Sequence, residues 1–482
     1  MPLTQRWTAT AELACLVVFF CWLIFLPLPF GSMIEESRPA LIAVPLALCV
    51  IAASIRLYAT RDRTNTAQPT RAWLILGNGA LLLLATVALQ LVPLPRGVLA
   101  WLSPESEAIW SAASRIVTFA GGTPRTNWPL TVDPQATAFE LFRMAALLAA
   151  FATAAMLIRS HARRQMLAVV LCGAATFEVL YGVREAALNR YAIWGWTNRL
   201  VFNRVTGTYV NPNHYAHYLA IVLPMALFIA AVCWHRAGGR ETSRSQRLVM
   251  LLESSVALTG FALLAALGCL GGVLLAQSRG ALLSLAAGLL AVGAMLPGRR
   301  VARTAFAVMA GLTVIATLAL FLGPERTVGR FLGSDSALGG RRIGLESAAG
   351  IYARFPLLGS GAGTFERVVS MEQTDDHGHI YHHVHNDYAE IAATTGTAGF
   401  VIAMVTLFGG YVALVRMTFG AAAQETTWSR RLYQAAALAS LTIAMVHALV
   451  DFNFYIPANP ATLAAIVGAS VASLDHDKRT RR

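Results

Sequence analysis

The sequence predicts an all-α, polytopic integral membrane protein, and three features lead to that fold class. The chain of 482 residues is 56% hydrophobic and only 13% charged, which is too apolar for a soluble protein of this length. Apolar runs that could cross about 30 Å of hydrocarbon recur from end to end. The short loops between these runs alternate between arginine-rich and arginine-poor. One membrane domain with about twelve transmembrane helices is therefore expected over residues 1–482.

Hydropathy locates each expected span to within a few residues. The first span is expected to stay in the chain, because no small-residue cleavage site follows its long apolar stretch. The expected spans are residues 12–29, 39–57, 73–92, 137–158, 166–188, 217–234, 256–277, 281–296, 304–322, 387–415, 432–450 and 460–474.

Arginine and lysine in the short loops indicate the orientation, because cytoplasmic loops carry an excess of both. With the N-terminus inside, the inner segments hold clusters such as Arg61, Arg63 and Arg71, and the C-terminal tail ends in basic residues. Both termini are therefore expected in the cytoplasm. The net charge of +13 is explained by this pattern facing an anionic leaflet, so membrane lipids are implied as partners and no nucleic acid is.

This topology leaves three long outer loops, residues 93–136, 189–215 and 323–386. The last two carry arginines that the positive-inside rule does not require. Their planar donor groups suit phosphate oxygens, so an anion bound outside is expected, with solvated loop charge as the alternative. These arginines are Arg190, Arg199, Arg204, Arg326, Arg330, Arg341, Arg342, Arg354 and Arg367.

Polar residues gather at two helix ends on the outer side. "TGTYVNPNHYAHYL" brings Asn211, Asn213 and His214 to one span, and "HALVDFNFYIPANP" brings His447 and Asp451 to another. Helix-entry roles are the alternative for the first set. A hydrogen-bonded pair is the alternative for the second, because the two residues are four apart on one helix face.

In "LAQSRGALLSL", Arg279 stands between two spans with almost no loop. A cation at that depth contacts an anion or extends to the headgroups.

The outer loop before residue 387 combines an amphipathic stretch over residues 343–355, a glycine-rich turn and a histidine-rich segment. The turn "PLLGSGAG" could hold phosphate on its amides. A nucleotide-binding P-loop is not indicated, because no strand precedes it and no Lys-Ser or Lys-Thr pair follows. Zinc is an alternative for the histidine-rich segment. Its ligands would come from His377, His379, His382, His383, His385, Asp375 and Asp376.

The motifs resemble those of the bacterial O-antigen ligase superfamily, which also contains O-antigen polymerases and protein O-oligosaccharyltransferases. His385 and Asn386, followed after nine residues by Gly396 and after two more by Gly399, reproduce the pattern H-[NSQ]-x9-G-x-x-[GTY]. In the right order come "GTYVNPNH", "SRG" at 278–280, "GR" at 340–341, "PLLGSGAGTF" and "HALVDFNFYIPAN". The resemblance covers residues 206–459. Leu345 departs from the Trp of many relatives, which puts the local packing of Arg341 in question.

The resemblance implies an inverting, metal-independent glycosyltransferase of the GT-C type that needs no cofactor, in the bacterial inner membrane with a periplasmic active site. Its donor would be a glycan on a polyprenyl pyrophosphate, typically undecaprenyl pyrophosphate. Arg279 and Arg341 would stabilise the pyrophosphate, and His385 would act as the general base or orient the acceptor. Substrate contacts are expected from the residues around them. These are Arg342, Asn211, Asn213, His214, Asn386, Asp387, Glu390, His447 and Asp451.

The acceptor stays open between another carrier-linked repeat, the lipid A core and a protein hydroxyl. A polymerase or ligase is favoured over a protein glycosyltransferase, because no added soluble domain for a protein acceptor is visible. Asp387 and Glu390 compete with His385 as bases. From another class, a transporter or metal-dependent channel would need ionisable residues inside the spans. Only Glu140, Arg143 and Glu178 are candidates.

Overall fold

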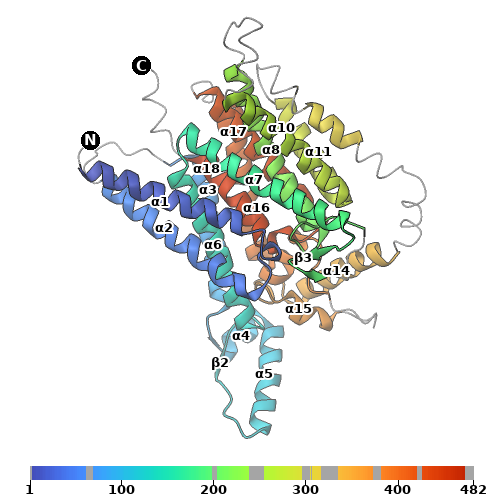
Figure 1. Cartoon of the computed structure of the whole chain (residues 1–482). Helices are drawn as coiled ribbons and strands as arrows, with labels where there is room; N and C mark the ends of the chain where they lie inside the picture. The colour runs from blue at the N-terminus through green and yellow to red at the C-terminus, as the bar shows by residue number, and fades with distance from the viewer. Residues whose placement is uncertain are drawn as a thin grey trace, which may run out of the picture.

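The chain folds into one bundle of helices, which confirms the all-α membrane architecture (Figure 1). The computed structural model describes residues 3–60, 69–197, 203–237, 254–295, 304, 307–315, 335–372, 381–420 and 426–472. The bundle helices are α1 (Leu3–Phe25), α2 (Arg38–Thr60), α3 (Arg71–Gln90), α6 (Pro134–Leu157), α7 (His161–Ala187), α8 (Pro212–Ala237), α10 (Ser254–Leu275), α11 (Arg279–Met295), α16 (Asp387–Phe419), α17 (Trp428–His447) and α18 (Ala458–Val471).

These helices correspond to the expected spans. Among the described residues, eight helices are long and apolar enough to cross a membrane, and α11 and α18 contain shorter apolar stretches. The expected span 304–322 is described only at residue 304 and over 307–315, where it is helical. Arg279 begins α11 four residues after α10 ends, as the near absence of a loop predicted.

The bundle is built around α8. Every residue of its apolar window is buried, and α7, α10, α11 and α17 pack against it. A helix that is apolar on all sides becomes stable in this way, by burial against other helices. Helix α16 is the opposite case, because only 17% of its apolar window is buried and α3 covers one side of it. Its remaining surface is available to lipid.

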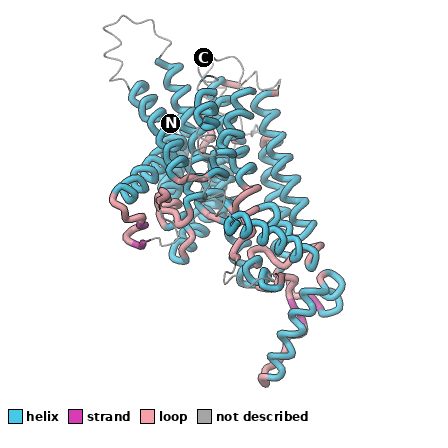
Figure 2. The backbone as a smooth tube through the Cα atoms, turned by 90° about the vertical axis from the view of Figure 1, so that its right-hand side faces the viewer, coloured by secondary structure: helices cyan, strands magenta, loops and turns pink. Residues whose placement is uncertain are grey.

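A separate arm projects from one end of the bundle (Figure 2). It consists of β1 (Leu94–Pro95), α4 (Arg96–Leu102), α5 (Pro104–Phe119) and β2 (Asn127–Trp128), and the two strands pair antiparallel with Leu94 opposite Trp128. In Figure 1, α1 begins and α18 lies toward the end of the bundle away from this arm.

The loop before α16 folds against the arm side of the bundle. It contains α14 (Asp335–Arg354), α15 (Phe365–Val368) and the short 3-10 helix η3 (Val369–Met371). Helix α14 begins at Asp335 and not at residue 343 as expected. The turn around Gly340 packs on the segment that precedes α16, since a Cβ on Gly340 would lie 3.3 Å from the Tyr381 ring. Arg354 fastens α14 to the arm by an ion pair with Glu105 at 2.9 Å.

Short connecting elements complete the arm side of the bundle. A hairpin of β3 (Ala192–Ile193) and β4 (Trp196–Thr197) follows α7, with Ala192 opposite Thr197. The 3-10 helices η1 (Phe30–Ser32) and η2 (Glu35–Ser37) connect α1 to α2, and η5 (Asn453–Tyr455) connects α17 to α18. The turn containing η5 is where the polar residues of the next section converge.

Candidate functional site

The start of α16 holds His385 against the end of α17. His385 has a φ of +57°, and the side chain of Asn386 caps α16. The Asn386 side chain donates a hydrogen bond to the Leu449 carbonyl at 2.9 Å, and the Asp387 amide donates one to the Ala448 carbonyl at 2.9 Å. These two hydrogen bonds attach the start of α16 to the turn after α17 and so position His385.

Asp451 is the carboxylate that His385 contacts. Its Oδ1 lies 3.3 Å from Nδ1 of His385 and 3.5 Å from Nε2 of His214, and it accepts the amide hydrogen of Phe452 at 3.0 Å. The Asp451 side chain is 1% exposed, whereas that of His385 is 31% exposed. Burial acts to raise the pKa of Asp451, but the contacts with His214 and His385 outweigh it and hold the pKa well below its usual range. Asp451 is thus a buried, ionised carboxylate beside an accessible imidazole.

The ring of Phe452 separates three imidazoles. His383 stacks on it with ring centroids 4.3 Å apart, and His214 and His385 approach edge-on at 4.6 and 4.8 Å. Because an aromatic ring fills the space between them, each imidazole has one defined orientation. We call His214, His383, His385, Asp451 and Phe452 the histidine–carboxylate cluster.

A second histidine pair lies behind this cluster. Nδ1 of His217 and Nδ1 of His447 are 2.9 Å apart in a buried hydrogen bond, so one ring donates and the other accepts. The expected bond between His447 and Asp451 is absent from the described contacts. The cause is that α17 ends at His447, so Asp451 lies in the following turn, and its amide bonds to the His447 carbonyl at 3.1 Å.

Gly280, the residue after Arg279, packs directly against His447. A Cβ on Gly280 would lie 2.9 Å from Nε2 of His447, so the first turn of α11 approaches this histidine as closely as a glycine allows. Arg279 itself is half-buried at the helix start. A cation is unfavourable at the N-terminus of a helix, whose amides also attract anions. An anion at this point would be stabilised by the Arg279 guanidinium and by the helix amides.

Arg341 approaches the same region from α14. A Cβ on Gly344 would lie 2.9 Å from the Val384 carbonyl oxygen, which shows how closely α14 packs on the segment before His385. Arg341 is half-buried and interacts electrostatically with His447. No hydrogen bond or ion pair joins its guanidinium to another residue in the part of the chain that the structure describes.

Arg342, the next residue, has a different environment. Its Nε donates to Glu346 at 2.7 Å on the outer surface of α14, and the two side chains are 81% and 60% exposed. The hydrogen bond to Glu346 raises the pKa of Arg342 above its ordinary value. The structure therefore does not bring Arg342 together with Arg341 and His385, and its expected contact with substrate stays a prediction.

Glu390, in the first turn of α16, contacts the cluster through His383. Its Oε1 lies 2.8 Å from Nδ1 of His383, and its Oε2 accepts the Val384 amide hydrogen at 2.9 Å. Burial acts to lower the pKa of His383, but the Glu390 carboxylate outweighs it and raises that pKa. Because both Glu390 oxygens are engaged, it is less available than His385 as a base. Asp387 is fully buried and accepts the Phe454 amide hydrogen at 3.2 Å.

Asn211 and Asn213 are engaged in local contacts. Asn211 accepts the Asn213 amide hydrogen at 2.9 Å, and the Asn213 side chain accepts from Arg204 at 3.0 Å. These bonds shape the entry to α8 and so position His214, whose carbonyl accepts from Asn459 at 3.2 Å. The helix-entry interpretation fits both asparagines, and substrate contact by them stays a prediction.

Residues 356–363, "PLLGSGAG", form what we call the glycine-rich loop. The amides of Gly359, Ser360 and Gly361 bond to the carbonyls of Phe355, Ala393 and Thr394. The Ala362 amide bonds to the side chain of Gln90 at 2.9 Å. These amides are already bonded within the protein and cannot also hold a phosphate. The loop instead joins α3, α6 and the early part of α16.

Gly396 lets α16 receive this loop. It interrupts the helix with φ +65° and ψ −171°, and a Cβ there would lie 2.5 Å from the Gly359 amide nitrogen. The amides of Thr397 and Ala398 bond instead to the carbonyls of Pro356 and Leu357. The glycine is therefore required by both its backbone conformation and the close approach of the loop.

The zinc alternative has no assembled site in the described residues, among which no group of three or more potential ligands is found. His382 is exposed and contacts Glu366 at 3.0 Å. His377, His379, Asp375 and Asp376 lie outside the residues that the structure describes.

Two supporting features escaped the sequence analysis. Phe452 is one of many apolar residues near a helix end, and nothing in the sequence marks it as the centre of three imidazoles. Arg143 was considered only for transport, yet it bonds to Glu140 at 2.8 Å and to the Phe454 carbonyl at 2.7 Å. It therefore holds the η5 turn, and with it Asp451, against α6.

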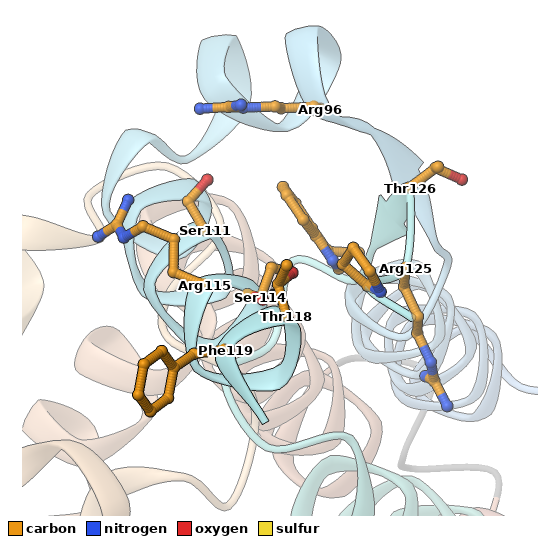
Figure 3. A pocket seen from close by; sticks show the side chains of 10 residues that line it. Arg96, Ser111, Ser114, Arg115, Thr118, Phe119, Arg125 and Thr126 are labelled. Carbon is orange, nitrogen blue, oxygen red and sulfur yellow. Dashed lines mark hydrogen bonds between the residues drawn. The ribbon is translucent and has the colours of Figure 1, made fainter. Parts of the chain in front are cut away.

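A hollow of about 760 Å³ lies in the arm, away from the cluster (Figure 3). Its wall combines the hydroxyl-bearing face of α5 with Trp128 of β2 and arginines from several elements. Arg96 is paired with Glu107 at 2.6 Å, and Arg115 and Arg125 are the other two cations. No residue of the histidine–carboxylate cluster lines this hollow.

Comparison with known proteins identifies one segment. Residues 261–404 match the model of a family described as O-antigen ligase. The match runs from α10 into α16 and contains Arg279, Arg341 and His385. No curated protein matches the chain.

Proposed function

We propose that the chain is a glycosyltransferase of the O-antigen ligase or polymerase type, which transfers or polymerises glycan from a polyprenyl-pyrophosphate-linked donor. The match of residues 261–404 to a family described as O-antigen ligase supports this. One observation carries the proposal. His385 contacts a buried carboxylate, the start of α11 that carries Arg279 packs against His447, and Arg341 interacts electrostatically with His447. A proton acceptor and anion-binding groups are the two requirements of glycosyl transfer from a pyrophosphate.

The donor would lie with its polyprenyl chain in the membrane and its pyrophosphate between Arg279 and Arg341. Negative charge grows on the pyrophosphate as the bond to the anomeric carbon breaks. Guanidinium groups aimed at that charge stabilise the transition state by roughly 3–4 kcal/mol for each well-placed donor. Arg341 is suited to this role because no described carboxylate competes for it.

His385 would act on the acceptor. With Nδ1 protonated and donating to Asp451, Nε2 is left to accept the proton of the acceptor hydroxyl. The hydroxyl oxygen then attacks the anomeric carbon, the bond to the pyrophosphate oxygen breaks, and the pyrophosphate leaves as an anion. General-base catalysis of this kind contributes roughly 10²- to 10⁴-fold. The Asp451 carboxylate would stabilise the imidazolium that forms.

A single displacement inverts the anomeric centre and needs no covalent intermediate, so a second nucleophilic carboxylate is not required. The chemistry proposed here uses only side chains of this protein, so metal-independent transfer is expected. The same residues would serve whether the acceptor is another carrier-linked glycan, the lipid A core or a protein hydroxyl. We favour the first two, and therefore a polymerase or a ligase.

The site is proposed to face the periplasm from the bacterial inner membrane, with both termini in the cytoplasm. Support comes from Figure 1, where α1 begins toward the end of the bundle opposite the arm and the loop before α16. The alternating arginine pattern independently favours the same orientation.

The transporter alternative finds little support in the buried ionisable residues. Glu140 is paired with Arg143, and both carboxylate oxygens of Glu178 bond to Thr208, at 2.8 Å each. Engaged in this way, Glu140, Arg143 and Glu178 stabilise the fold and are not available as exchangeable proton sites. The observations therefore favour the glycosyltransferase.

The test is glycan transfer by the purified protein in liposomes that contain polyprenyl-pyrophosphate-linked glycan, with and without lipid A core, in the presence of EDTA. His385→Ala and Arg341→Ala should each abolish transfer, while His382→Ala, a change at an exposed neighbouring histidine, should not. A longer carrier-linked product identifies a polymerase and a glycosylated lipid A identifies a ligase. Transfer that survives both the His385 and Arg341 substitutions would refute the proposal.

A further inference from the structure

A second group of arginines surrounds a hollow at the other end of α16. The hollow has a volume of about 730 Å³ and lies between α3, α16 and α17. Arg71 comes from the first residue of α3, Arg416 from the last turn of α16 and Arg430 from the first turn of α17. Because α16 begins at the histidine–carboxylate cluster and ends here, the hollow is separate from the candidate site.

The charges around the hollow are all of one sign. Three guanidinium groups line it, and no carboxylate does so among the described residues. Arg430 is 3% exposed and donates to the Ala472 carbonyl at 2.8 Å, which holds its guanidinium at the base of the hollow. Arg71 and Arg416 line the hollow without an ion pair among the described residues. Cations in a partly buried space are stabilised by an anion, and guanidinium groups pair best with phosphate oxygens.

The remaining wall is apolar and open to the side of the bundle. Ile75, Phe408 and Val412 line the hollow, and the Phe408 and Val412 side chains are 52% and 46% exposed. These side chains belong to the surface of α16 that would face lipid. A ligand with a phosphate headgroup and an acyl chain could therefore place its phosphate among the arginines and its chain along α16.

One polar atom in the hollow points to a hydrogen-bond donor on the ligand. Gln434 is 1% exposed, and its Oε1 has no hydrogen-bond partner among the described residues, although its Nε2 donates to the Ser470 carbonyl at 3.3 Å. A buried acceptor without a donor costs roughly 1–3 kcal/mol, so a hydroxyl delivered by a ligand would be favourable.

We propose that this hollow binds the headgroup of an anionic glycerophospholipid from the leaflet on the side of the chain termini. The phosphate contacts Arg71, Arg416 and Arg430, and a glycerol hydroxyl donates to Gln434. Basic pockets between transmembrane helices bind anionic headgroups by the same electrostatics. This lipid site is independent of the proposed glycosyl transfer.

The experiment is native mass spectrometry and thermal unfolding of the full chain in detergent, with added phosphatidylglycerol, phosphatidylcholine or inorganic phosphate. The wild-type protein should retain phosphatidylglycerol over phosphatidylcholine and be stabilised by it. The Arg71→Gln, Arg416→Gln double variant should lose about 30-fold of that preference, which corresponds to about 1 kcal/mol for each arginine.

Arg163→Gln is the matched control, because it removes a cation near the start of α7 that is paired with Glu12 and does not line the hollow. It should keep the wild-type preference. Gln434→Leu should reduce the preference for phosphatidylglycerol over a phosphatidic acid without a glycerol headgroup. Equal binding of phosphatidylglycerol and phosphatidylcholine by the wild type would overturn the proposal. So would protection by inorganic phosphate equal to that by phosphatidylglycerol, which would indicate a site for a free anion.

Discussion

The histidine–carboxylate cluster lies at the start of α16, and the glycine-rich loop bonds to the same helix at Ala393 and Thr394. The two regions use their polar groups in opposite ways. In the cluster, Asp451 Oδ2 has no partner among the described residues, and His385 is partly exposed. In the loop, the amides of Gly359, Ser360 and Gly361 are all bonded to backbone carbonyls of the protein. The cluster retains polar groups that could act on a substrate. These three loop amides, in contrast, are all used in hydrogen bonds that stabilise the fold.

This difference separates chemistry from architecture within one stretch of sequence. Both regions contain residue types that can bind anions or move protons. Only their hydrogen-bond partners distinguish them, since a bonded amide cannot also hold a phosphate. Substitutions of His385 and Asp451 should therefore impair turnover more than stability, and those in the loop should impair stability first.

The largest effect is expected from Asp451→Asn. It keeps the shape of the side chain but removes the charge that would stabilise the His385 imidazolium. By analogy with carboxylate–histidine pairs in other enzymes, turnover should fall by roughly 10²- to 10⁴-fold with little change in KM. The measurement is initial-rate kinetics of glycan transfer in liposomes.

The matched loop variant is Ser360→Ala, which removes a buried hydroxyl that contacts Thr364 at 2.8 Å. It should lower stability by about 1 kcal/mol and leave turnover within a few-fold of the wild type. If Ser360→Ala reduced turnover as much as Asp451→Asn, the proposed division between the two regions would be wrong.

The next largest effect is a loss of stability in Gly396→Ala. A Cβ at this position would lie 2.5 Å from the backbone of Gly359 and Leu357, and φ +65° with ψ −171° is accessible essentially to glycine alone. Strain and overlap together should cost about 3 kcal/mol or more. Thermal unfolding in detergent would show a large fall in the midpoint.

Gly173→Ala is the control for this change, because it lies within α7 and a Cβ there meets nothing within 4 Å. Alanine is the better helix former by about 1 kcal/mol, so the midpoint should stay the same or rise. An equal loss in both variants would indicate a general intolerance of the bundle to added methyl groups.

A smaller effect with a pH signature is expected from His383→Gln. Glu390 raises the pKa of His383 in the folded protein. The pair therefore stabilises the fold fully below the unfolded pKa of about 6.5, and this contribution is lost as the pH rises through the higher folded pKa. The variant should be roughly 1.5–3 kcal/mol less stable at pH 6 and closer to the wild type at pH 9. His382→Gln, at an exposed position, should show a smaller pH dependence, and the reverse trend for His383 would refute the ion pair.

The sequence was sufficient to predict the helical bundle and part of the candidate site. Apolar length predicted the spans because lipid imposes it, and the motif singled out His385, which proves to contact a buried carboxylate. That Asp451 is the partner of His385 could not be predicted. It depends on α17 ending at His447, which moves Asp451 off the helix face and toward His385 and His214. The role of the loop amides could not be predicted either, because their acceptors on α16 lie about thirty residues away in sequence, at Ala393 and Thr394.

The smallest effect should come from Arg342→Ala, and its comparison with Arg341→Ala is the most direct test of the site. The two residues are adjacent and chemically identical, so any difference must come from position. Arg342 is paired with Glu346 in solvent, where water screens the contact. Arg341 is half-buried, interacts with His447 and has no ion pair among the described residues. The loss of transfer activity should therefore be at least about tenfold smaller for Arg342→Ala than for Arg341→Ala. Equal losses would mean that the donor recognises the general positive charge of the loop, and Arg341 would then have no special claim to the pyrophosphate.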